Sequence, residues 1–278
     1  MDNSALATRM KNYYEAIPKT RLMRRTPVAL RLDGKAFHSF TRGFERPFDE
    51  VLIKSMQQTM KYLCENIQNS ILGYHQSDEI TLILLDYQTF DTDAWFDYEV
   101  QKMCSIAASM ATMAFNKIFA EEVDRFCGNP HNSGVQANRY IAATLQGAMF
   151  DCRCFNIPKE EVTNLIYWRQ LDASRNSVQM VGQAYFSHNE LQEKTCSDIQ
   201  DMLMEKYSIN WNDFPTHQKR GSCCIKERTE EEVVSTPEWG DPVVHTLVRS
   251  RWIIDTEVPI FKGEGRDYIE RLIRVGEA

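Results

Sequence analysis

The feature that most constrains this chain is a short apolar strand that ends in a carboxylate. Residues 28–32 carry Val28, Leu30 and Leu32 on one face, and Asp33-Gly34 follows them directly. An alternating apolar run of this length between turn residues is typical of a buried strand. The pattern therefore places Asp33 at a strand end.

The segments that follow predict a helix and then a hairpin. A helix is expected from Phe48 to Ile67, because apolar residues recur at helical spacing after Pro47. Two short apolar runs, Ile71–His75 and Ile80–Leu85, then predict an antiparallel hairpin with acids near its tip. The expected order is strand, helix, strand, strand.

The next part of the chain continues this alternation of helices and strands. Helices are predicted over residues 95–126 and from Lys159 to about Phe186, with a strand from Cys152 to Ile157 between them. This order favours an α+β fold with an antiparallel or mixed sheet and helices on one side of it.

The pattern weakens after about residue 187. We expect shorter helices, a strand over 222–226, an acidic link at 230–232 and a strand-helix ending from Arg251 to Ile273. The interpretation is a catalytic domain of residues 1–186, followed by a smaller C-terminal α+β extension of residues 187–278 packed on it.

Composition and charge exclude some classes of protein. A net charge of −7 argues against a protein that coats nucleic acid, although basic residues gather within the first 35 positions. There is no apolar run of about 20 residues and no secretory signal, so we expect a soluble cytoplasmic protein without a membrane partner. Its eight cysteines are therefore expected to be reduced thiols.

The acidic residues at the strand ends predict a divalent-metal site. Asp33 and the pair Asp78-Glu79 would meet at one edge of the sheet, and Mg²⁺ takes such oxygen ligands together with water and phosphates. Two ions could stabilise the attacking and leaving oxygens together. Asp78 and Glu79 would point to opposite faces of an extended strand, so Asp78 is the expected direct ligand.

A glycine and several cations lie close to these acids in the sequence. Gly34 allows close approach of a ligand to the backbone, and the N–H groups of residues 34–38 could cradle a triphosphate. Lys35, His38 and Arg46 add donors or positive charge nearby. The alternative is an ordinary Asp-Gly turn and a solvated hairpin tip.

Three sequence motifs strengthen the prediction of a divalent-metal site, because together they resemble the motifs of one protein family. They are R-L-D-G-K-A-F-H at 31–38, G-Y-H-Q-S-D-E at 73–79 and W-R-Q-L-D at 168–172. The chain resembles the tRNA-histidine guanylyltransferase family and its 3′-to-5′ polymerase relatives from about residue 5 to 221. The resemblance implies a polymerase-palm-like fold, two Mg²⁺ ions, tRNA and nucleoside triphosphates as partners, and a tetramer.

The resemblance also implies roles for individual residues. The implied catalytic carboxylates are Asp33, Asp78 and Glu79, which with Gly34 would also hold the metal ions. Nucleotide contacts are implied for Gly34, Lys35, Ala36, Phe37, His38, Arg46 and Ser77. Contacts with tRNA or with the activating nucleotide are expected for Arg24, Arg25, Arg169, Asn176, Lys219 and Arg220.

The reaction implied by the resemblance has two steps. ATP first adenylylates the 5′-monophosphate of a tRNA, and the 3′-hydroxyl of GTP or another nucleoside triphosphate then attacks the activated end. Eukaryotic members that add guanosine to tRNA-histidine carry H-I-N-N-L-Y-N after the third motif, whereas residues 174–180 here read S-R-N-S-V-Q-M. This departure favours the branch that repairs 5′-truncated tRNA against a template.

Other interpretations stay open at this point. Single-guanosine addition to tRNA-histidine, a nucleotide cyclase with the same fold and a tRNA binder without chemistry are the alternatives. Cys127, His131, Cys152 and Cys154 could hold zinc, although C-x-C lacks the usual spacing of zinc ligands. His38 and His75 could act as acid-base groups, and Tyr13 and Tyr14 could stack on RNA.

Overall fold

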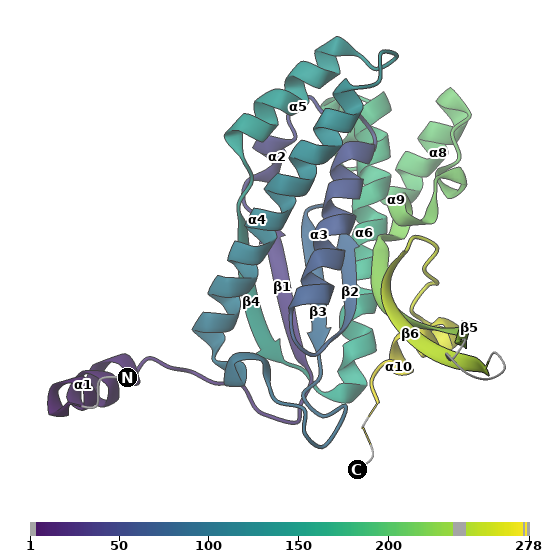
Figure 1. Cartoon of the computed structure of the whole chain (residues 1–278). Helices are drawn as coiled ribbons and strands as arrows, with labels where there is room; N and C mark the ends of the chain where they lie inside the picture. The colour runs from purple at the N-terminus through teal and green to yellow at the C-terminus, as the bar shows by residue number, and fades with distance from the viewer. Residues whose placement is uncertain (1–3, 236–242, 275, 277–278) are drawn as a thin grey trace.

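The computed structural model describes residues 4–235, 243–274 and 276, and in these the chain forms one six-stranded antiparallel sheet. Its strand order is β4-β1-β3-β2-β5-β6 (Figure 1). The bounds are β1 Val28–Gly34, β2 Ser70–Gln76, β3 Glu79–Leu84, β4 Phe150–Asn156, β5 Ser222–Ser235 and β6 Val243–Asp255. The antiparallel form of the expected sheet is confirmed.

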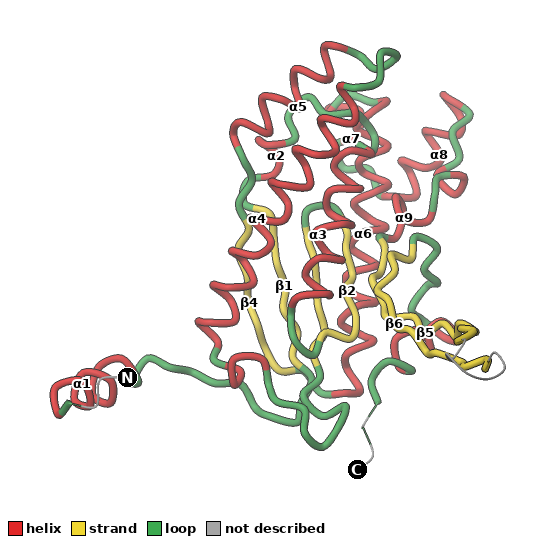
Figure 2. The backbone as a smooth tube through the Cα atoms, viewed as in Figure 1, coloured by secondary structure: helices red, strands yellow, loops and turns green. Residues whose placement is uncertain are grey.

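Helices surround the sheet, and short helical turns connect several of them (Figure 2). The α-helices are α1 Ala5–Met10, α2 Phe37–Phe40, α3 Glu50–Asn66, α4 Val100–Cys127, α5 Gly134–Gln146, α6 Val162–Tyr185, α7 His188–Leu191, α8 Cys196–Tyr207, α9 Thr216–Arg220 and α10 Asp267–Glu270. The short turns are η1 Lys11–Glu15, η2 Trp95–Tyr98, η3 Lys159–Glu161, η4 Trp211–Asp213 and η5 Gly263–Arg266.

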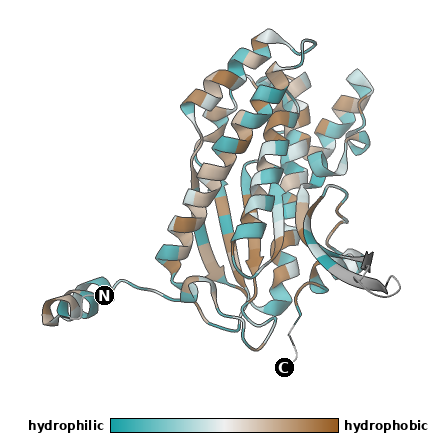
Figure 3. Ribbon diagram, viewed as in Figure 1, coloured by the Kyte–Doolittle hydropathy of each residue, from teal (hydrophilic) through white to brown (hydrophobic). Residues whose placement is uncertain are grey.

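Apolar side chains cover both faces of the sheet. Leu30 and Leu32 of β1 point to the face packed by α3 and α4, whereas Ala29 points to the face packed by α6. Because side chains alternate along a strand, two separate cores result. The expectation of helices on one side was therefore wrong, and the brown strands of Figure 3 lie between helical layers.

Three local expectations also need correction. The predicted helix over 95–126 breaks after η2, because Phe96 and Asp97 take positive φ, and α4 begins at Val100. Helix α5 was not predicted. The acidic residues 230–232 are not a link, since they pair with residues 246–248 inside the β5–β6 hairpin.

The C-terminal part joins the sheet directly. Strand β5 pairs with β2 from Leu72 to His75, and α8 and α9 pack on α6. A third core beside α6 contains Val181, Ile199 and Trp211. The proposed boundary near residue 187 stays a prediction.

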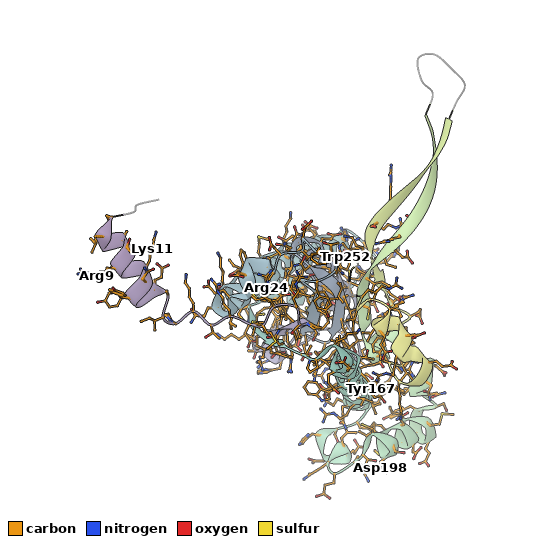
Figure 4. All side chains as sticks on the ribbon, turned by 90° about the horizontal axis from the view of Figure 1, so that it is seen from below. Arg9, Lys11, Arg24, Tyr167, Asp198 and Trp252 are labelled. Atoms are coloured by element: carbon orange, nitrogen blue, oxygen red, sulfur yellow. The ribbon has the colours of Figure 1, made fainter. Side chains whose placement is uncertain are left out.

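Two elements stand away from the body of the molecule. Helix α1 has no buried residue and extends to one side, and the β5–β6 hairpin extends to another (Figures 1 and 4). In the described residues, α4 is the one helix with the length and hydropathy of a membrane span, yet it packs on β4, α3 and α5. A third of its apolar stretch is buried in the core.

Candidate active site

The site forms where β1 ends beside the β2–β3 turn. The Gly34 N–H donates a hydrogen bond of 3.1 Å to the carbonyl oxygen of Asp78, and Asp33 lies directly opposite Glu79 in the β1–β3 register. Ser77 forms the turn with Asp78 and takes φ 51. Sheet pairing thus brings Asp33 and Asp78 together, as the sequence predicts.

The two aspartates influence each other electrostatically. Burial raises the pKa of Asp78, and the negative charge of nearby Asp33 raises it further, while a hydrogen bond from Ser77 partly offsets both effects. A pair of carboxylates held together in this way is stabilised by a cation between them. The arrangement therefore fits a divalent ion.

Glu79 has a different environment from the two aspartates. Its Oε1 accepts a 2.6 Å hydrogen bond from Arg169 Nε, and its Oε2 lies 3.1 Å from Arg31 Nε in an ion pair. Both carboxylate oxygens thus face guanidinium groups, and Glu79 is 5% exposed. In the part of the chain that the structure describes, no three acidic, His or Cys side chains converge on a metal site.

A cavity of about 670 Å³ opens beside Asp78, and Asp33 is not among the residues that line it. Of the predicted site residues, it is lined by Gly34, Ala36, Phe37, His38, Arg46, Ser77 and Asp78. Lys35 is exposed outside this lining. A cavity of this size suits a nucleotide.

The backbone of residues 34–38 offers fewer free donors than the sequence suggested. The N–H of Gly34 is bonded to Asp78, and the N–H of Lys35 donates to the carbonyl of Met149 at 2.8 Å. Ala36 then takes a left-handed conformation with φ 55 and begins α2. Among the described residues, the N–H groups of 36–38 have no protein acceptor, so they remain available to a ligand.

Gly34 is required by packing rather than by its φ angle. A Cβ added there would lie 2.3 Å from Cδ2 of the Phe37 ring. Phe37 in turn packs in the core against Phe40, Phe115 and Phe150. The ring therefore closes over the glycine backbone next to Asp33.

Sequence reasoning missed several residues that shape the cavity. Thr41, Arg42, Glu45, Asp49 and Gln183 also line it. Asp49 is buried, and it accepts hydrogen bonds from Tyr140 Oη at 2.6 Å, from Glu45 N and from Leu52 N. Asp49 is the N-cap of α3, which begins at Glu50, whereas the sequence placed the start of this helix at Phe48 and so missed the cap.

The N-terminal arginines lie at the other end of the sheet. Arg24 and Arg25 precede the start of β1, whereas Asp33 is its second-last residue. Arg24 Nε donates to the buried Asp86 at 2.9 Å, and its guanidinium also pairs with Asp97 at 3.0 Å. Arg24 is therefore held in an ionic cluster away from the cavity, and the Arg25 side chain donates to the carbonyl of Phe90 at 3.3 Å.

The predicted contacts on α6 and α9 lie closer to the site. Asp172 accepts hydrogen bonds from Arg169 at 2.8 Å and from Asn176 at 3.5 Å, so these two residues share a helical face as expected. Asn176 lines a small second cavity with His75 and Ser77.

The two basic residues of α9 differ in exposure. Lys219 is buried, donates to the carbonyl of Asn212, and has its pKa lowered by burial. The carbonyl of Arg220 accepts a 2.6 Å hydrogen bond from Tyr74. Lys219 is therefore held inside the fold.

The cysteines do not assemble as the zinc alternative requires. All eight are free thiols, as expected. The Sγ atoms of Cys104 and Cys154 lie 3.5 Å apart between α4 and β4, while Cys127 ends α4. No zinc-type cluster occurs within the described residues.

The geometry defines a class of protein. An antiparallel sheet that pairs two carboxylates at its edge, with one of them and a closely packed glycine lining a nucleotide-sized cavity, is an arrangement suited to the transfer of nucleotidyl groups.

Comparison with known proteins places the chain in a family. The profile of the tRNAHis guanylyltransferase (Thg1) family matches residues 7–158. The chain belongs to this family, whose members are nucleotidyltransferases that act on tRNA.

Three proteins illustrate the similarity. A bacterial tRNA(His) guanylyltransferase (Thg1)-like protein in complex with ATP is 38% identical, with a TM-score of 0.78 over 98% of this chain and all of that one. The structure of the bacterial Thg1-like protein in complex with GTP is 37% identical to this chain, with a TM-score of 0.73 over 97% of this chain and 99% of that one. The tRNA(His) guanylyltransferase of Schizosaccharomyces pombe is 24% identical over 76% of this chain and 78% of its own length.

Proposed function

We propose that this protein adds nucleotides in the 3′-to-5′ direction to the 5′ end of tRNA, and that it restores 5′-truncated tRNA against a template. The observation that carries the proposal is the Asp33–Asp78 pair, which the hydrogen bond from Gly34 to Asp78 holds together, with Asp78 in the wall of the 670 Å³ cavity. ATP would activate the 5′-monophosphate, and nucleoside triphosphates would extend it.

Two observations support the choice of nucleotides as substrates. The bacterial relative, which matches nearly the whole chain, has been seen with ATP and with GTP. In this chain, the cavity wall combines the cations Arg42 and Arg46 with the free N–H groups of residues 36–38, a set of donors suited to a triphosphate.

We propose that Asp33, Asp78 and the backbone oxygen of Gly34 hold two Mg²⁺ ions. Bound there, the ions would neutralise the charge of the phosphates and would stabilise the negative charge on the attacking and leaving oxygens. The side chains of this chain would then mainly bind and orient the substrates, because phosphoryl transfer needs little covalent participation by protein. Glu79 would act indirectly, by holding Arg31 and Arg169 behind Asp33.

The repair branch rests on residues 174–180. Arg175 and Asn176 here both donate to Asp172. The stretch lacks the histidine and second asparagine of the eukaryotic enzymes that add guanosine to tRNA-histidine. Single-guanosine addition and nucleotide cyclisation are the competing functions, and a homotetramer in the cytoplasm is the proposed setting.

A product-length assay separates these functions. The protein is incubated with Mg²⁺, ATP, the four nucleoside triphosphates and 5′-monophosphorylated tRNA that is either full-length tRNA-histidine or lacks its first nucleotides. Template-matched restoration of the truncated tRNA, lost in Asp78→Asn, supports repair. One guanosine added only to tRNA-histidine supports the alternative branch. A cyclic nucleotide formed without RNA, or no product, overturns the proposal.

A further inference from the structure

A third cavity, larger than the one beside Asp78, lies at the opposite end of β2 from the candidate active site. Its volume is about 820 Å³. Strands β2 and β5 pair only from Leu72 to His75, so β5 diverges from the start of β2 and leaves an open fork. Arg271, Leu272, Arg274 and Gly276 line one side of the fork. Strands β5 and β6 form the hairpin of Figure 1, and residues 225–228 of β5 line another side.

Positive charge is concentrated in this fork. Lys226, Arg228, Arg271 and Arg274 line it, and Glu227 is the one acid among its described lining residues. The surplus is notable because the whole chain carries a net charge of −7. A local basic cavity in an acidic protein indicates a polyanionic partner.

The part of the protein that the structure describes does not neutralise the charge of these four cations, although Arg274 Nε donates a 2.7 Å hydrogen bond to the Arg271 carbonyl. Within the described residues, none of them forms an ion pair with a carboxylate, in contrast to Arg24 with its aspartates. Lys226 instead lies 5.7 Å from the Trp252 ring centre, and Arg271 lies 5.1 Å from that of Tyr268. The aromatic contacts orient the cationic groups without neutralising them.

We infer that this fork binds the phosphate backbone of the tRNA body, away from the 5′ end that reacts. The inference rests on the proposed function, because it takes the tRNA as the polyanion. Seven-residue β2 separates the fork from the Asp78 turn by roughly 20 Å along the strand. One extended RNA can span this separation, whereas a single nucleotide cannot. Guanidinium groups suit phosphate oxygens because their donors match two oxygens at once.

The inference gives the C-terminal part of the chain a function. The fork combines β5 with the segment after α10, both beyond residue 158, where the match to the family profile ends. The fork would contribute affinity for RNA but no sequence specificity, because phosphate contacts are the same for every nucleotide sequence. Long RNAs would therefore bind through the fork, and short ones would not.

The test compares two double variants. Arg228→Gln/Arg274→Gln removes two fork charges without touching either aromatic contact, and Lys54→Gln/Lys117→Gln removes two exposed charges from α3 and α4. Binding of full-length truncated tRNA and of a short hairpin RNA with the same 5′ end is measured as a function of salt. Circular dichroism melting verifies that each variant is folded.

For the fork variant, we expect the tRNA Kd to rise roughly tenfold and the slope of log Kd against log salt to fall by about 2, with hairpin binding unchanged. The control variant should bind both RNAs like the wild type. Unchanged tRNA binding by the fork variant, or equal loss for both RNAs, overturns the inference. If the wild type binds tRNA through the fork but extends no RNA, the proposed function fails and the fork assignment stands.

Discussion

Arg169 Nε donates a 2.6 Å hydrogen bond to Glu79 Oε1, and both side chains are nearly fully buried beneath the candidate site. The same guanidinium donates to Asp172 through its other end. One arginine therefore joins α6 to the β3 strand end that follows Asp78.

Removing this arginine should destabilise the fold. Arg169→Ala leaves the Glu79 carboxylate buried beside one remaining arginine, and the loss of one partner of a buried pair costs about 3–5 kcal/mol. We expect a decrease of this size in the free energy of unfolding from urea titration. Arg175→Ala removes an exposed arginine from the same aspartate and should cost below about 1 kcal/mol. Equal costs for the two variants would contradict the structural role of Arg169.

Substitution of Asp33 or Asp78 should have the opposite effect to substitution of Arg169: activity should be lost and stability kept. Asp78→Asn and Asp33→Asn remove like charge from the site, so neither variant should lower the melting temperature. Both should lose nucleotide addition by at least about 100-fold if the carboxylates organise the transferred phosphate. The measurement is melting by circular dichroism together with product formation. Lower stability with retained activity would assign the aspartates a purely structural role.

Gly34 should tolerate no side chain. Gly34→Ala puts a Cβ into the Phe37 ring, and overpacking of this kind costs about 1–3 kcal/mol. The matched control is Gly134→Ala, because a Cβ there meets nothing within 4 Å at the start of α5. That change should be neutral or stabilise the helix by up to about 1 kcal/mol. Thermal melts of the two variants are compared, and similar melting temperatures would contradict the predicted overpacking at Gly34.

His75 should make stability fall at acidic pH. Burial lowers the pKa of His75 from its ordinary 6.5 to about 4, and the neutral ring lies 2.9 Å from the Ser77 carbonyl and 3.3 Å from the Ser222 hydroxyl. Between pH 6.5 and pH 4 the unfolded chain therefore binds a proton that the folded chain does not. This linkage removes about 3 kcal/mol of stability as the pH falls through that window, and nothing above it.

Urea unfolding at several pH values tests whether His75 causes this loss of stability at acidic pH. The stability of His75→Gln should depend less on pH between 6.5 and 4 than that of the wild type. His188→Gln, at an exposed position on α7, should keep the wild-type dependence. If all three proteins show the same slope, another group is responsible for the acid sensitivity.

The sequence by itself determined the order of elements and the ends of the central strands. Alternation at Val28–Leu32 and the polar residues between two apolar runs placed Asp33 and Asp78 at strand ends, where pairing had to bring them together. These are local patterns with a period of two, and a strand end is visible in them. Helix α5 was missed, as its first residues follow a Gly- and Asn-rich turn.

Only the tertiary structure decided how these local patterns act together. Whether helices cover one or both faces depends on which side α6 packs, and Glu79 became an arginine partner because α6 brings Arg169 beneath it. The ionic cluster of Arg24, the buried state of Lys219 and the basic fork between β2 and β5 all join residues far apart in sequence. Such contacts arise from packing and charge pairing in three dimensions, which no periodicity along the chain records.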